Sequence, residues 1–243
     1  MKMPIHKMPQ IDDDVAMGVR ALRFVALFWC LIPVACGPNL ANRAPNTIIV
    51  LSRVVALPAV AISVEVDASD QSQWDEQREN AMFSAINPEL QKQAREKGAL
   101  AFPEEQIKVC GKECSFQVLT LRKQGTSAAM EIAVQMEGMH DYHATSVADW
   151  RIYGNYAQLR KTTGADYALF VLVRDLRETT GRGVANFFTG RHTYFKQVGV
   201  ACVADLAKRS MVWCHTESDA WGDLRNPQEA RRAVQKLLSD LAP

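Results

Sequence analysis

The cysteines carry the most specific chemistry that this sequence offers. Of the six, Cys202 and Cys214 lie in two apolar runs at nearly equal distances from the turn between them. In an oxidising compartment this spacing favours a cross-strand disulfide, and buried free thiols are the alternative. Cys110 and Cys114 are spaced to close a small loop by a second disulfide. A zinc site built from these four with His215 would lack the paired short spacings of structural zinc modules.

A second group of polar side chains occurs at His140-Asp141-Tyr142-His143, where two imidazoles lie three residues apart beside a carboxylate. Metals bind such groups, but this stretch falls between two predicted helices, where polar loops are common, and we interpret it as a solvated loop. The serine-hydrolase elbow, the H-E-x-x-H helix and the phosphate-binding loop are absent from the sequence. We therefore expect no catalytic residue, no metal and no cofactor, and a protein that is not an enzyme.

Aromatic and basic side chains gather between positions 179 and 197, a stretch without any acidic residue. Arginine and aromatic residues are typical of the centres of protein interfaces, and cations also favour anionic lipids or glycans. The alternative is a helix or hairpin extension whose phenylalanines cap the core. The candidate partner-binding residues are Arg182, Phe187, Phe188, Arg191, Tyr194 and Lys196.

Composition excludes several classes of protein. The chain has 243 residues, of which 48% are hydrophobic and 23% charged, as in a folded globular protein. Lys and Arg (28) balance Asp and Glu (27), which leaves a net charge of +1. A protein that binds nucleic acid by neutralising phosphates carries a large positive charge, so we expect no nucleic-acid partner.

The N-terminal part reads as a secretory signal. Arg20 and Arg23 precede an apolar run that ends at Ala35, directly before Cys36. This run is shorter than the roughly 20 residues that a membrane-spanning helix needs, so a signal peptide is favoured over an anchor helix.

The stretch Pro33-Val34-Ala35-Cys36 resembles the bacterial lipoprotein signal. The resemblance implies a lipidated Cys36, and Gly37 after it implies delivery to the periplasmic face of the outer membrane. Ordinary secretion, which would leave a soluble periplasmic protein, is the alternative. The expected organisation is an N-terminal extension and signal peptide at 1–35, a lipidated cysteine with a short tether at 36–46, and a periplasmic α/β domain at 47–243.

Hydrophobic periodicity and capping signals divide this last part into strands and helices. The apolar stretch Asp166–Asp175 predicts a strand that is covered on both faces, at the middle of the sheet. Asn226, Pro227 and Glu229 predict the start of a C-terminal amphipathic helix. The other expected elements are one or two strands in 47–66, a helix over 72–98 that is kinked or restarted at Pro88, a strand over 115–121, a helix from 126 or 127 to 137, a helix that opens at Ser146 or Asp149 and ends near Gly164, and a hairpin of 198–206 with 211–216.

This order of elements predicts a single α/β domain with a mixed, partly antiparallel sheet of about five strands flanked by helices. A resemblance to known proteins rests on residues 163–170, 181–182, 197–201 and 222–225, together with Asp205-Leu206, Val212-Trp213, Pro227 and Ala230. In these residues the C-terminal half resembles a family of uncharacterised bacterial lipoproteins. It is distantly similar to the periplasmic α/β domain shared by the TolB amino-terminal domain, the curli secretion lipoprotein and the lipoprotein activators of penicillin-binding proteins.

What this resemblance implies is a binding or assembly role without chemistry. We therefore expect a membrane-anchored periplasmic lipoprotein that serves as an accessory for an envelope component, a protein or a glycan, with residues 179–197 as the contact surface. The alternative is a periplasmic enzyme or small-ligand carrier that uses a pocket at the strand ends. The hairpin turn has Arg209 where relatives tend to have glycine, which requires either positive φ at a non-glycine residue or a different turn.

Overall fold

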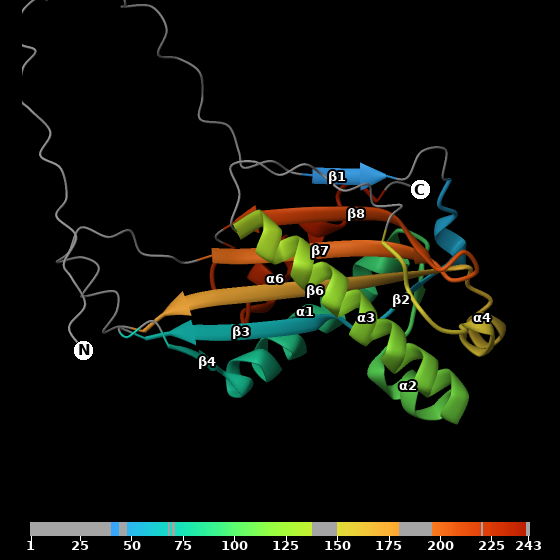
Figure 1. Cartoon of the computed structure of the whole chain (residues 1–243), viewed down its shortest axis with the longest axis horizontal. Coiled ribbons are helices and arrows are strands. Elements are labelled where there is room, and N and C mark those ends of the chain that lie inside the picture. The colour runs from blue at the N-terminus through green and yellow to red at the C-terminus, as the bar shows by residue number, and fades with distance from the viewer. Residues whose placement is uncertain are drawn as a thin grey trace, which may run out of the picture. The chain divides into compact units, whose positions relative to one another are not determined.

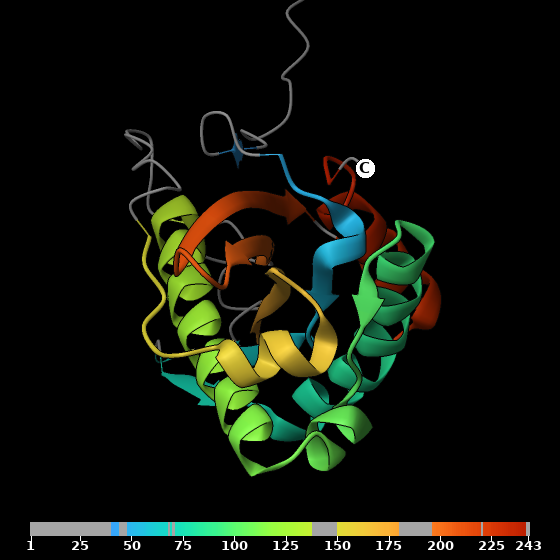
Figure 2. The same ribbon diagram turned by 90° about the vertical axis from the view of Figure 1, so that its right-hand side faces the viewer.

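Helices cover both faces of one mixed β-sheet (Figures 1 and 2). The computed structural model describes residues 40–43, 48–67, 69, 71–137, 150–179, 196–219 and 221–241, and Gly37–Pro243 forms one compact unit. The strands are β1 (Leu40–Arg43), β2 (Val54–Ala56), β3 (Val60–Val66), β4 (Ser72–Trp74), β5 (Leu100–Ala101), β6 (Tyr167–Glu178), β7 (Lys196–Asp205) and β8 (Ser210–Asp219). The helices are η1 (Leu51–Arg53), α1 (Glu76–Glu96), α2 (Glu104–Val109), α3 (Lys112–Glu137), α4 (Ala157–Thr163) and α6 (Pro227–Leu237).

The sheet is built around β6. On one side β6 pairs with β7 in antiparallel fashion, and the hairpin partner β8 and then β1 extend the sheet further. On the other side β2 and β3 both run parallel to β6, one after the other, and β5 and β4 lie beyond them. The predicted α/β class with a mixed, partly antiparallel sheet is confirmed. The described part of the chain contains eight strands instead of about five, because three of the short ones, β1, β4 and β5, have no periodicity that a sequence pattern could reveal.

A step of three residues, Leu57–Ala59, separates β2 from β3 along the same side of β6. Gln91 of helix α1 fills this step. Its Nε2 donates to the carbonyl oxygens of Ala56 (3.2 Å) and Leu57 (3.3 Å), and its Oε1 accepts from the backbone N–H of Phe102 (2.8 Å). The Phe102 N–H also donates to the Ala56 carbonyl (3.1 Å), so the buried Gln91 side chain adds to the backbone hydrogen bonds at this step.

The two faces of β6 belong to two hydrophobic cores. Figure 2 shows the helices on both sides of the sheet. Ala168, Phe170 and Leu172 pack on the side of α3 and α4. The alternate residues of the same strand, such as Leu169 and Val171, pack on the side of α1 and α6. The prediction of a central strand covered on both faces is confirmed.

One helix replaces two elements that the sequence pattern suggested. The strand expected over 115–121 and the separate helix expected from 126 or 127 are both wrong, because α3 runs without interruption from Lys112 to Glu137. Cys114, Val118 and Leu121 are fully buried, which is the i, i+4, i+7 spacing of one helical face. The intervening apolar residues, which gave the impression of strand alternation, point to the outside.

The predicted ends of two helices are confirmed. Helix α4 ends at Gly164 with φ 70°, and the side chain of Asn226 caps α6 by accepting from the backbone N–H of Gln228 (2.8 Å). The start expected at Ser146 or Asp149 is wrong, because residues 150–156 are not helical and α4 begins at Ala157. Glu229, three residues after the N-cap, forms an ion pair with Arg232 (3.1 Å) instead of accepting a hydrogen bond from the backbone N–H of Asn226.

Pro88, at which the sequence predicts a kink or a restart of the helix, lies inside an unbroken α1. Pro88 and Ser84 are both on the exposed side of the helix. The Ser84 carbonyl that loses its N–H partner therefore remains accessible to water, which lowers the cost of proline within the helix.

Part of the expected tether belongs to the sheet. Leu40–Arg43, within the segment 36–46, forms the edge strand β1 and pairs with residues 213–216 of β8. Extended backbone next to an open sheet edge can complete its hydrogen bonds there, which a polar composition does not reveal. The segment 1–35 and Cys36 lie outside the described residues. Among the helices that the structure describes, none is long and apolar enough to cross a membrane.

Candidate functional site

A disulfide joins Cys202 and Cys214 across the β7–β8 hairpin. The two residues are paired directly in the strand register, their Cα atoms lie 4.1 Å apart, and both are buried. The turn between the strands holds Arg209 at φ 58°, so this position takes the left-handed conformation without glycine. The disulfide restrains the two strands close to that turn, which is a structural role.

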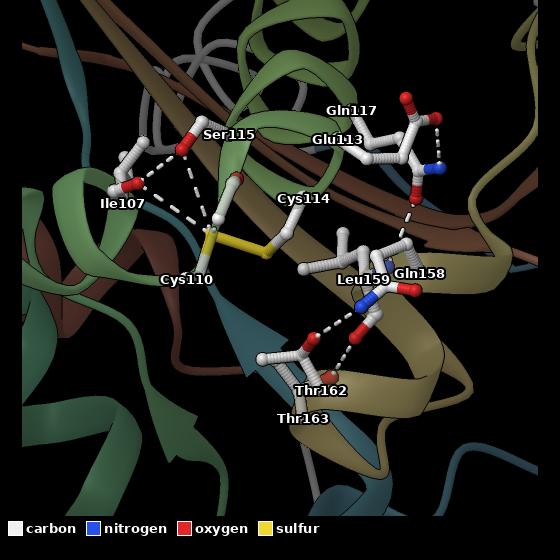
Figure 3. The surroundings of a disulfide bond; sticks show 11 residues. Ile107, Cys110, Glu113, Cys114, Ser115, Gln117, Gln158, Leu159, Thr162 and Thr163 are labelled. Atoms are coloured by element: carbon white, nitrogen blue, oxygen red, sulfur yellow. Dashed lines mark hydrogen bonds between the residues drawn. A yellow bond between two sulfur atoms is a disulfide. The ribbon is translucent and has the colours of Figure 1, made fainter.

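A second disulfide joins Cys110 and Cys114 at the turn between α2 and α3 (Figure 3). Cys110 is the C-cap residue of α2 and is partly exposed, whereas Cys114 lies in the first turn of α3 and is fully buried. The hydroxyl of Ser115 donates to the carbonyl of Ile107 and lies 3.8 Å from the Cys110 Sγ.

With all four cysteines in disulfides, they form no zinc site with His215. In the part of the chain that the structure describes, no group of three His, Cys, Asp or Glu side chains could hold a metal ion. His215 itself is buried on β8. Its Nε2 lies 3.1 Å from Glu217 Oε1 and its Nδ1 3.1 Å from Asp240 Oδ2, and its ring stacks on Trp213. Of these contacts, the one with Asp240 connects the segment after α6 to the sheet, and the other two lie within β8.

A buried ionic cluster lies where β6, β7 and α1 meet. The Nε of Arg78 donates to Asp175 (2.9 Å), its Nη2 donates to Asp223 (3.3 Å), and the amide of Gln197 donates to Asp175 (3.1 Å). Hydrogen bonds from Arg225 hold the pKa of Asp223 well below its usual range, against the opposing effect of burial. Sequence reasoning missed this cluster, since Arg78 and Asp175 are 97 positions apart. Its members bind one another, so the cluster fixes the connection from β8 to α6.

The strongest candidate for a binding site is a groove of about 800 Å³ along the outer face of α3, which we call the α3 groove. Three large side chains with apolar surface in this groove are exposed: Phe116 by 66%, Leu119 by 54% and Tyr153 by 73%. A group of exposed aromatic and aliphatic residues of this kind is typical of an interaction surface. Its lining also includes Lys123, Glu131, Trp150 and Arg151.

Hydrogen bonds hold the second wall of the α3 groove in place. The side chain of Gln124 binds the backbone of Tyr153 at both groups, donating to its carbonyl (2.6 Å) and accepting from its N–H (2.5 Å). The backbone of residues 150–152 forms hydrogen bonds with the backbone of Arg209, in the turn of the β7–β8 hairpin, and of Met211, near the start of β8. The aromatic residues of this wall therefore project from a segment that is tied to both α3 and the sheet.

The sequence contained a signal for this groove. Phe116, Leu119 and Lys123 are spaced by three and four residues, which places them on one face of a helix. The prediction of a strand over 115–121 hid this relation, because alternation assigns Phe116 and Leu119 to opposite faces of a strand.

A smaller pocket of about 500 Å³ lies between the edge strand β5 and helices α2 and α4. Its wall consists of Leu100, Ala101, Phe102, Gln106, Val109, Cys110, Thr162 and Thr163. Apart from the disulfide-bonded Cys110, none of these described residues carries an ionisable side chain. The pocket therefore has no acid or base of its own for proton transfer.

The residues singled out in the sequence between 182 and 194 lie outside the described residues, as do His140, His143 and the lipidation candidate Cys36. Lys196 begins β7 and pairs with Leu176 of β6. The expectation that 179–197 forms the contact surface stays a prediction.

Comparisons with known proteins show distant likenesses. No protein-family model and no curated protein matches the chain. Among solved structures it is similar to the PelC dodecamer from Paraburkholderia phytofirmans. In space group C2 the identity is 11%, the coverage 84% of this chain and 99% of that one, and the TM-score 0.36. In space group P6 the identity is 12%, the coverage 82% of this chain and 96% of that one, and the TM-score 0.34.

It is also similar to lipoprotein GNA1162 from Neisseria meningitidis, with 15% identity, 68% of this chain and 78% of that one covered, and a TM-score of 0.28. These TM-scores are too low to carry a functional argument. The resemblance to the TolB domain and to the activators of penicillin-binding proteins stays a prediction.

Proposed function

We propose that this chain is a lipid-anchored envelope protein that acts by binding a protein partner in the α3 groove, without catalysis. The observation that carries the proposal is the joint exposure of Phe116, Leu119 and Tyr153 around one groove of about 800 Å³. Leaving three large apolar side chains in water forgoes the free energy of burying them, on the order of 2 kcal/mol each. A partner that covers them recovers this free energy.

The chemistry of the groove favours a protein segment over a glycan. Leu119 and Phe116 offer aliphatic and aromatic surface, which matches apolar side chains, whereas the hydroxyl groups of a sugar need polar partners that these two residues do not supply. Lys123 and Arg151 provide two positive charges against the one negative charge of Glu131. The expected ligand is therefore a segment with apolar anchors and a neighbouring acidic side chain.

Lipidation at Cys36 would support such a function by confinement. A tethered domain meets its partner at a high effective concentration, so that a weak interface suffices. The residues 179–197 stay a second candidate for the contact surface, and the same crosslinking experiment can be carried out there.

Photo-crosslinking in intact cells tests the proposal. A photo-reactive amino acid at position 119 should give a discrete adduct with one protein, identified by mass spectrometry. Tyr153→Ala and Arg151→Glu should each reduce this adduct at least about tenfold, in line with the loss of an interface anchor. Trp74→Ala is the matched control, because Trp74 is similarly exposed (68%) and lies on β4, outside the groove.

The proposal fails if position 119 gives no adduct, or if Tyr153→Ala and Trp74→Ala affect the adduct equally. An adduct with a glycan in place of a protein would overturn the assignment of the partner. The melting temperatures of the variants, expected to stay within a few degrees of the wild type, exclude loss of the fold as the cause.

A further inference from the structure

We propose that the Cys110–Cys114 disulfide is a thiol-exchange site, at which a small-molecule thiol forms a mixed disulfide with Cys110. Three features of the described residues carry this inference: access to one sulfur only, a favourable position for the other sulfur as the leaving group, and a pocket beside the reacting atom.

Access is one-sided. Cys110 is partly exposed and lines the pocket of about 500 Å³, whereas Cys114 is fully buried against the core beneath α3 and α4. Figure 3 shows the disulfide between Ile107 and Ser115 on one side and helix α4 on the other. An attacking thiolate from solution therefore reaches the Cys110 Sγ and not the Cys114 Sγ.

The position of Cys114 makes it the sulfur that leaves. It is the third residue of α3, and its side chain is fully buried in the core. Because apolar surroundings disfavour a free thiolate, the released sulfur takes up a proton and stays in the core as a thiol.

The pocket gives the incoming thiol a place to bind. Its volume lies within the range of about 300–1,000 Å³ that is typical of sites for small ligands. Phe102, Leu100 and Val109 offer apolar surface, and Gln106, Thr162 and Thr163 offer hydrogen-bonding groups. The uncharged wall suits a thiol carried on a small peptide or a polar metabolite.

The exchange is a balanced two-step reduction. A thiolate attacks the Cys110 Sγ, a new S–S bond forms to the thiol, and the bond between Cys110 and Cys114 breaks, with its electron pair on Cys114. A second thiolate then attacks the sulfur of the bound thiol, and the pair of thiols leaves as a disulfide. Two small thiols lose two electrons, and their two protons end on Cys110 and Cys114.

The same chain contains a matched reference. The Cys202–Cys214 disulfide is buried within the β7–β8 hairpin, with exposed fractions of 0 and 5%, and neither residue lines either pocket. Reduction of this bond requires local opening of the sheet, whereas reduction at Cys110 does not.

Site-resolved exchange with glutathione tests the proposal. The folded full chain is incubated with reduced glutathione without denaturant, quenched and alkylated, and each cysteine peptide is quantified by mass spectrometry. We expect Cys110–Cys114 to react at least about 100-fold faster than Cys202–Cys214, because only the first is accessible without opening. Equal rates, or faster reaction of Cys202–Cys214, would overturn the proposal.

Two serine variants test the assignment of the two sulfurs. Cys114→Ser, which leaves Cys110 free, should accumulate a stable mixed disulfide with oxidised glutathione. Cys110→Ser, which leaves the buried Cys114 free, should not. If both variants are modified at the same rate, or Cys110→Ser faster, the one-sided mechanism is wrong. Thermal melting checks that each variant is folded, and the exchange rates of the wild-type chain decide the proposal even if one variant does not fold.

Discussion

The absence of a side chain at Gly199 decides how closely α6 packs on the sheet. A Cβ at this position would lie 2.6 Å from the ring of Trp221 and 2.8 Å from both Cδ atoms of Leu237. These neighbours are buried in the core between the sheet and α6. Gly199 therefore serves a close approach of helix and strand, and its φ angle is not the reason for its presence.

Gly199→Ala should lower the free energy of unfolding by about 1–3 kcal/mol, the usual cost of excess volume in a tight core. Chemical denaturation measures the effect. Combined with Leu237→Ala, which removes two of the three atoms in conflict and leaves the contact with Trp221, the alanine should cost less than it does alone. Additive effects of the two substitutions would contradict this account.

Among the elements, α3 contributes most to the α3 groove, the proposed binding surface. One face of the helix supplies Cys114 and Val118 to the core, and the opposite side supplies Phe116 and Leu119 to the α3 groove. Apolar residues on both sides remove the amphipathic contrast by which a helix is usually recognised. This is why the sequence pattern predicted a strand here. In contrast, β6 and α6 could be predicted, because each has a pattern that fits one element only.

The β7–β8 hairpin could also be predicted, because its signal is local in the sequence. The equal distances of Cys202 and Cys214 from the turn are visible in the sequence, and the structure pairs these residues directly. The α3 groove and the Arg78 cluster have no such local signal. They arise where segments distant in sequence meet, so only the folded chain reveals them.

The N-cap of α6 allows a test at the scale of this element. Asn226→Ala should destabilise the protein by about 1 kcal/mol, because the N–H of Gln228 loses its acceptor. Asn226→Asp, which keeps a side-chain acceptor, should retain most of the stability. Thermal or chemical denaturation measures both variants, and an equal loss for Ala and Asp would contradict the capping role.

For the molecule as a whole, the proposed anchor and the folded unit are separable in sequence. The compact unit begins at Gly37, directly after the proposed lipidation residue. Anchoring can therefore change where the domain acts without changing how it folds.

Cys36→Ser should move the protein from the membrane fraction to the soluble periplasmic fraction, because the thioether to lipid cannot form. Cell fractionation followed by immunoblotting measures this. Cys30→Ser is the matched control, since the signal interpretation places Cys30 in the removed segment, and its membrane association should be unchanged. Retention of the Cys36→Ser variant in membranes would refute the lipid anchor.

The hydrogen bonds of Gln91 have a consequence for motion within the fold. They connect α1 to Ala56, Leu57 and Phe102, so a shift of this helix by one turn, about 5.4 Å, would break three buried bonds at once. This layer is therefore held in one register against the strands. A ligand that moved α1 by a turn would therefore have to compensate for the loss of these three bonds.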